Sequence, residues 1–171
     1  KMHQVFPDSF LIYQPKHILS GDFYWFKNIG NLRFVGVVDC TGHGVPAAML
    51  TVLAMSLINQ IVVIFGITDP AEILRQLDVA LAQYTQDKTK VAQVKDGLDM
   101  VISRYDEHTS ELVTAGAHRP LYLFRKDELI EVKGAKYALG SNNDRSSFIA
   151  NNTIQLQKND MAYLFSDGFP D

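Results

Sequence analysis

Residues 32–44 read LRFVGVVDCTGHG, and the interpretation of the whole chain starts from this stretch. Its first seven residues are rich in β-branched side chains and predict a strand buried on both faces. Asp39 follows, then a glycine-rich turn, and Pro46 marks the start of a long apolar helix. Asp39 is therefore either a cap for that helix or an acid held at a strand end, beside a loop region that ligands can reach.

Two further acids occupy similar positions. Asp22 follows Gly21 at the start of an aromatic-rich segment, and Asp167 follows the expected strand 161–165. Carboxylate oxygens suit Mg²⁺ or Mn²⁺, which take oxygen ligands. The lone cysteine, Cys40, has no C-x-x-C partner, so a zinc site of cysteines and histidines is not expected. The three acids together predict a site for hard divalent ions.

Composition and charge narrow the classes of function. The chain of 171 residues is long enough for one domain, residues 1–171, and its 47% hydrophobic and 20% charged residues are ordinary for a globular protein. A net charge of -3 without any basic run gives no electrostatic case for a nucleic-acid partner. One cysteine cannot form an internal disulfide, which fits either a reducing compartment or no preference. The expected location is cytoplasmic, either free or as the domain of a membrane-anchored sensor.

Residues 45–68 carry no charged side chain and are long enough to span a bilayer, which takes about 20 residues. Polar residues interrupt the segment, and no basic cluster flanks it to set an orientation in a membrane. We therefore expect a helix buried in the domain that ends near Phe65, not a membrane span.

The remaining pattern indicates strands in hairpins with the helices gathered in the middle. A second helix is expected from Asp69-Pro70, and residues 134–152 are expected to form a mobile flap over one face. This arrangement predicts an α+β fold with antiparallel sheets, and a full G-x-G-x-x-G dinucleotide motif is absent. The expected strands are 10–13, 22–29, 32–38, 98–105, 111–115, 121–125, 129–132, 153–157 and 161–165.

Five motifs, in order and spacing, resemble the SpoIIE-type branch of the metal-dependent protein phosphatases (PPM, the protein phosphatase 2C-like group). The resemblance covers almost the whole chain. It implies a PPM-type α-β-β-α sandwich, with two antiparallel sheets flanked by helices, and a centre for two Mn²⁺ or Mg²⁺ ions at one end. The motifs are GDFYW at 21–25, DCTGHG at 39–44, DG at 96–97, AGAHRP at 115–120 and SDG at 166–168.

The resemblance also assigns roles to single residues. Asp39 matches the carboxylate that bridges both ions, and Asp22 matches the acid on one of them. Cys40 stands where the family uses a backbone carbonyl, so its thiol is not implied as a ligand. Asp167 matches an acid on the other ion. Asp171 resembles an acid that helps to hold a weaker third ion in some relatives.

Other residues have two interpretations each. His43 is either a general acid for the leaving alkoxide or a histidine that bonds the loop backbone. Lys16 either meets a substrate phosphate or is a solvated lysine. Arg119, after His118, either binds substrate or forms a structural ion pair. His118 replaces the second acid for a third ion, so that ion is not expected here. Asp99 is assigned to the solvated surface.

The implied function is that of a bacterial signalling phosphatase. Its substrate would be a phosphoserine or phosphothreonine protein such as an anti-sigma factor antagonist, and an upstream sensor domain is expected. Whether the domain forms a homodimer is left open. Relatives continue beyond the position of Asp171, so we expect a fragment that lacks a C-terminal metal-binding segment and turns over slowly. The alternative is a pseudophosphatase, a partner-binding module with the same fold.

Overall fold

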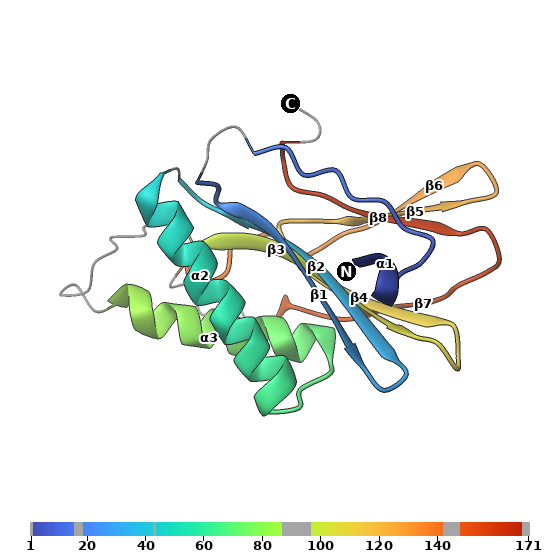
Figure 1. Ribbon diagram of the computed structural model, residues 1–171, viewed down its shortest axis with the longest axis horizontal. Helices are drawn as coiled ribbons and strands as arrows, with labels where there is room; N and C mark the ends of the chain where they lie inside the picture. Colours follow the sequence, from blue (N-terminus) through green and yellow to red (C-terminus); the bar gives the residue numbers. More distant parts are fainter. Residues whose placement is uncertain (1, 16–18, 43, 87–96, 142–147, 169–171) are drawn as a thin grey trace.

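The fold consists of two antiparallel sheets with two long helices against one of them (Figure 1). The computed structural model describes residues 2–15, 19–42, 44–86, 97–141 and 148–168. The larger sheet has the strand order β1-β2-β3-β4-β7, and the smaller has the order β6-β5-β8. The predicted α+β class with two antiparallel sheets is confirmed. The elements are α1 Met2–Val5, β1 Asp22–Ile29, β2 Leu32–Cys40, α2 Val45–Asn59, π-helical η1 Gln60–Ile64, α3 Pro70–Gln86, β3 Leu98–Asp106, β4 Glu111–Ala117, β5 Leu121–Arg125, β6 Glu128–Val132, β7 Asn152–Gln155 and β8 Met161–Leu164.

The register of the first two strands follows from the turn between them. Ile29 pairs with Leu32 across Gly30-Asn31, and Gly30 adopts a φ of 60°, which favours glycine. Counting back from this turn pairs the first residue of β1 with Asp39 of β2, and β3 continues the same row. The turn therefore decides that Asp22 and Asp39 meet at the far end of this hairpin.

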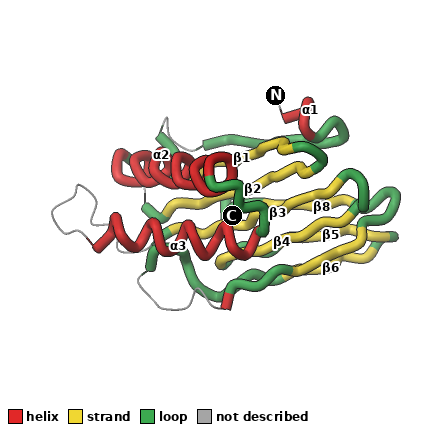
Figure 2. The backbone as a smooth tube through the Cα atoms, turned by 90° about the horizontal axis from the view of Figure 1, so that it is seen from below, coloured by secondary structure: helices red, strands yellow, loops and turns green. Residues whose placement is uncertain are grey.

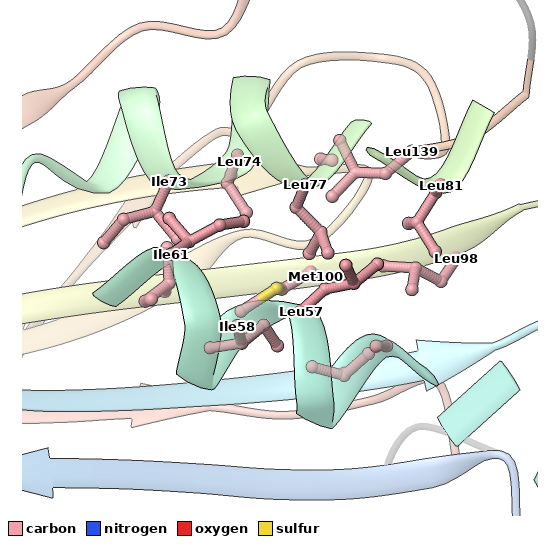
Figure 3. Close-up of a cluster of buried hydrophobic side chains, with 14 of the residues drawn as sticks. Leu57, Ile58, Ile61, Ile73, Leu74, Leu77, Leu81, Leu98, Met100 and Leu139 are labelled. Carbon is pink, nitrogen blue, oxygen red and sulfur yellow. The ribbon is translucent and has the colours of Figure 1, made fainter. Parts of the chain in front are cut away.

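Two hydrophobic cores hold the layers together. Side chains of α2, η1 and α3 gather around Met100 of β3 on one face of the larger sheet (Figure 3). Both helices lie side by side on that face (Figure 2). The neighbouring residue of β3, Val101, points the other way and packs against the smaller sheet, as the two-residue period of a strand requires. The second core comprises Val101, Leu112, Leu121 and Leu123.

Helix α2 packs in the domain as expected, but it is buried on one face only. Ile58 is fully buried, whereas Val52 is 69% exposed and Ile64 of η1 is 74% exposed. By length and composition alone, Val45–Ile64 could cross a membrane. One face contacts the larger sheet and α3, and no other described element covers the opposite face.

Helix α3 begins as predicted. Asp69 Oδ1 accepts a hydrogen bond of 2.8 Å from the backbone N–H of Glu72, and Pro70 is the first helical residue. Asn151 adds a second cap, because its Oδ1 accepts a hydrogen bond of 2.9 Å from the N–H of Ala71. The helix start is thus tied to the chain that precedes β7.

Two predictions about the chain outside the sheets were wrong. Residues 10–13 form no strand and contact the fold through side chains instead. The Phe10 ring packs edge-to-face against the Tyr163 ring. The described parts of 134–152 are packed and are no flap. Leu139 exchanges two backbone hydrogen bonds with Leu98, of 2.8 and 2.9 Å, and is fully buried together with Ile149. Residues 142–147 lie outside the described residues.

Candidate metal centre

Three aspartates lie in one row at the end of the larger sheet. Asp22 of β1 pairs with Asp39 of β2, and Asp39 pairs with Asp99 of β3. Opposed residues on neighbouring strands have side chains within contact distance of one another. The segment after β8 joins this row, because Ser166 Oγ donates a hydrogen bond of 2.8 Å to Asp22 Oδ2.

A single arginine nitrogen lies among the carboxylates. Arg119 Nη2 is 2.8 Å from Asp39 Oδ2, 3.2 Å from Asp99 Oδ2 and 3.2 Å from Asp167 Oδ2. The side chains of Arg119, Asp39 and Asp99 are only 14–16% exposed, whereas Asp167 is 61% exposed. Three acids from three separate strand ends therefore converge on one cationic position.

The turn after β4 delivers the arginine to this place. His118 adopts a φ of 58°, in the left-handed region, and its backbone N–H donates a hydrogen bond of 2.7 Å to Ala135. Its ring Nδ1 forms a hydrogen bond of 2.9 Å with Asp99 Oδ1. Gly116 permits the tight turn, because a Cβ there would lie 2.2 Å from the carbonyl oxygen of Arg119. The AGAHRP motif thus ends β4 with a turn that directs the Arg119 side chain toward the acids.

Burial and the neighbouring negative charges raise the pKa of Asp39. Burial, then the carboxylates of Asp22 and Asp167, raise the pKa of Asp39 from its ordinary value to about 7, although Arg119 opposes the shift. One guanidinium cannot neutralise four carboxylates. The centre therefore carries an excess of negative charge, which favours a further cation.

The backbone of Cys40 lies against Gly21, and its thiol lies in the core. The side chain is 2% exposed in the helix-facing core, and burial raises the pKa of the thiol to about 12. Its carbonyl oxygen approaches Gly21 so closely that a Cβ on Gly21 would lie 2.4 Å away. A neutral thiol that is buried in the core is a poor metal ligand and a poor nucleophile.

The donor set fits a hard divalent ion. Carboxylates and a backbone carbonyl are the oxygen ligands that Mg²⁺ and Mn²⁺ prefer. Arg119 Nε is buried without a hydrogen-bond partner, so the surroundings do not fully satisfy the guanidinium. Among the described residues, no group of three or more histidine, cysteine or acidic side chains is arranged to hold an ion as it stands. Arg119 is the cation among the acids in this structure.

The structure brings together five of the residues singled out from sequence, namely Asp22, Asp39, Asp167, His118 and Arg119. The alternative that Asp39 caps α2 was wrong, because the N-cap is Gly44 and no side chain bonds to it. Of the other predicted site residues, Lys16, His43 and Asp171 lie outside the described residues.

Asp99 was wrongly assigned to the solvated surface. It is 15% exposed and bonds to both His118 and Arg119. The sequence did contain a signal for this role of Asp99. Asp99 lies at the start of a strand two residues after Gly97, much as Asp22 lies at a strand start directly after Gly21. Its meaning depends on the register opposite Asp39, which local sequence does not contain.

Comparisons with known proteins agree with this geometry. A family model described as Stage II sporulation protein E (SpoIIE) matches residues 30–171. The SiaA-PP2C domain of Pseudomonas aeruginosa is 32% identical, with a TM-score of 0.79 over 94% of this chain and 61% of that one. The PP2C phosphatase domain of SpoIIE from Bacillus subtilis is 18% identical, with a TM-score of 0.70 over 89% of this chain and 41% of that one.

A structure of RsbX in complex with magnesium is 15% identical, with a TM-score of 0.68 over 90% of this chain and 69% of that one. At such identities the SpoIIE and RsbX structures show a shared fold alone. The chain spans less than two thirds of the SiaA and SpoIIE structures. No match is found among curated protein sequences.

Proposed function

Because the chain belongs to the SpoIIE family and has the fold of PP2C-type phosphatase domains, we propose that it hydrolyses phosphoserine or phosphothreonine in a partner protein. The observation that carries the proposal is the convergence of Asp39 and Asp167 on one cationic position, with Asp22 paired beside Asp39. The proposed setting is a bacterial signalling pathway, with a phosphorylated anti-sigma factor antagonist as substrate, a sensor domain upstream and a cytoplasmic location for this domain.

Asp22, Asp39, Asp167 and the carbonyl of Cys40 are the residues that would hold two Mg²⁺ or Mn²⁺ ions. Bound ions of this kind activate water for attack and neutralise charge on a phosphoryl group. RsbX, a structure of the same fold, is in complex with magnesium, which supports this choice of metal. Ser166 fixes the orientation of Asp22 through its 2.8 Å hydrogen bond, so the carboxylate is preorganised for its role.

Arg119 and His118 are the proposed phosphate-binding groups. A guanidinium presents planar donors that match phosphate oxygens, and the site is shielded enough to strengthen such contacts. His118 is 45% exposed, so its ring is accessible from solvent while Nδ1 is held by Asp99. In this proposal Arg119 and His118 orient the phosphoryl group beside the acids that would hold the ions. His43 remains the predicted general acid.

Substitution of Asp39 tests the proposal. Asp39→Ala removes the carboxylate proposed to be shared by both ions, so Mn²⁺-dependent hydrolysis of a phosphoserine protein should fall more than about 100-fold while the fold is retained. Circular dichroism checks the fold, and Asp8→Ala, at an exposed position, is the matched control. Undiminished activity of the Asp39 variant would show that this acid has no such role.

A pseudophosphatase is the second candidate, and the position of Arg119 favours it. The Arg119 guanidinium lies among three carboxylates and supplies a positive charge there that a bound metal ion would otherwise supply. Calorimetric titration with Mn²⁺ separates the two functions, because a pseudophosphatase should take up no ion at millimolar concentration. Arg119→Ala refines the test: an ion bound only by this variant indicates that Arg119 has replaced the metal.

A further inference from the structure

Asp99 binds the two residues that follow β4, His118 and Arg119, through the two oxygens of its carboxylate. Oδ1 is 2.9 Å from His118 Nδ1, and Oδ2 is 3.2 Å from Arg119 Nη2. Its side chain is 15% exposed, at the start of β3 and directly opposite Asp39. A rigid strand in the middle of the larger sheet therefore anchors both side chains of the turn.

Arg119 needs such an anchor. An arginine side chain has many rotamers, and a fixed partner reduces the conformational entropy that is lost when it binds an oxyanion. Asp39 and Asp167 are proposed to hold cations, and a carboxylate that is neutralised by a cation holds a guanidinium less strongly. Asp99 is the remaining acid within reach, and no metal role is assigned to it.

We propose that Asp99 is a positioning residue, which holds Arg119 and His118 in the orientation that receives the substrate phosphoryl group. This inference rests on the phosphatase function proposed above. Asp99 acts through its two partners and does not touch the substrate. Its loss should therefore weaken phosphate binding less when Arg119 is already absent, because only the part that acts through His118 then remains.

A double-mutant cycle with Asp99→Ala, Arg119→Ala and the double variant tests this coupling. The full-length protein is assayed with para-nitrophenyl phosphate and Mn²⁺. Each single variant should raise KM about tenfold or more, with a smaller change in kcat, and the double variant should raise KM by much less than the product of the two single effects. Losses that multiply in the double variant would overturn the proposal, because Asp99 would then act independently of Arg119.

Two controls separate positioning from general damage. Asp106→Ala, at the opposite end of β3, removes an acid that bonds Asn31 far from the centre, and it should leave KM unchanged. Asp99→Asn keeps the shape and loses the charge, so it replaces Asp99→Ala in the cycle if that variant does not fold. Rescue of KM by Asp99→Glu would support a carboxylate that acts through its charge.

A second readout distinguishes failure of this inference from failure of the proposed function. The same cycle is measured as the affinity for inorganic phosphate in buffer that contains Mg²⁺, so that Asp39 and Asp167 can be neutralised as the proposal requires. If the wild-type protein binds phosphate without hydrolysing para-nitrophenyl phosphate, the phosphatase assignment fails, and non-additive loss of phosphate affinity still supports the role of Asp99. Unchanged phosphate affinity in Asp99→Asn, or no phosphate binding by the wild type, overturns it.

Discussion

Gly21 shows how a single residue controls the geometry of the centre. A Cβ atom at this position would lie 2.4 Å from the carbonyl oxygen of Cys40, a separation that real Cβ atoms do not adopt. The backbone of the segment before β1 therefore lies directly against the end of β2. Only a residue without a side chain permits this approach, which places Asp22 beside Asp39.

Gly21→Ala should consequently lower the free energy of unfolding by about 1–3 kcal/mol, because the strand ends must move apart. Urea denaturation measures the change. Gly168→Ala is the matched control: an added Cβ there meets no atom within 4 Å, and the variant should differ from wild type by less than about 0.5 kcal/mol. Similar stabilities for both variants would contradict the close approach seen at Gly21.

At the scale of elements, α2 combines a buried and an exposed apolar face. Ile58 is fully buried beside Met100, whereas Val52 is 69% exposed. Ile58→Ala should lower the free energy of unfolding by about 2–4 kcal/mol, since it leaves a cavity in the core. Val52→Ala should change it by less than about 0.5 kcal/mol.

Thermal and urea denaturation of the two variants in detergent-free buffer measure these values. The comparison asks which face of α2 stabilises the domain. Equal effects at both positions would mean that the exposed face of α2 is covered in solution, and the packing of this helix would have to be revised.

At the scale of the whole molecule, an ion pair ties the two sheets together. Arg125 of β5 donates hydrogen bonds of 3.0 Å and 2.6 Å to the two oxygens of Asp160, and its Nη2 also bonds the carbonyl of Gln155 in β7 at 2.9 Å. Asp160 is 3% exposed and also accepts a hydrogen bond from the N–H of Gln157. The smaller sheet is thereby held to the last strand of the larger one.

This pair predicts a pH dependence of stability. The hydrogen bond from Arg125 lowers the pKa of Asp160 below its ordinary value. Because the folded pKa is the lower one, the stabilisation is complete above the unfolded value of about 3.9 and is lost as the pH falls through the folded pKa. Asp160→Asn should therefore lower the melting temperature at pH 6 and have little effect at pH 2.

Thermal melts of Asp160→Asn at the two pH values measure this difference, with the exposed Asp8→Asn as the control. The control should change the melting temperature little at either pH. A deficit of the Asp160 variant that is as large at pH 2 as at pH 6 would mean that the carboxylate charge contributes nothing, and that the variant disturbs packing alone.

Much of the architecture could be predicted because it depends on short-range patterns. The β1–β2 hairpin follows from a glycine-asparagine turn between two apolar strands, and α3 follows from its acid cap and proline. The prediction of a strand at 10–13 was wrong because apolar composition reveals burial but no pairing partner. The expected flap was wrong because the few apolar residues of 134–152, such as Leu139, find places in the core.

The sequence by itself determined the class of fold and the order of most of its elements, and it predicted the kind of chemistry, because strand period, turn residues and carboxylates at strand ends are local properties. Its motifs also indicated the family. The tertiary structure alone decided that Asp99 belongs to the centre, that Arg119 is the cation among its acids and that α2 has an exposed face. These features depend on strand register and on which surfaces meet, and both result from contacts between residues far apart in the chain.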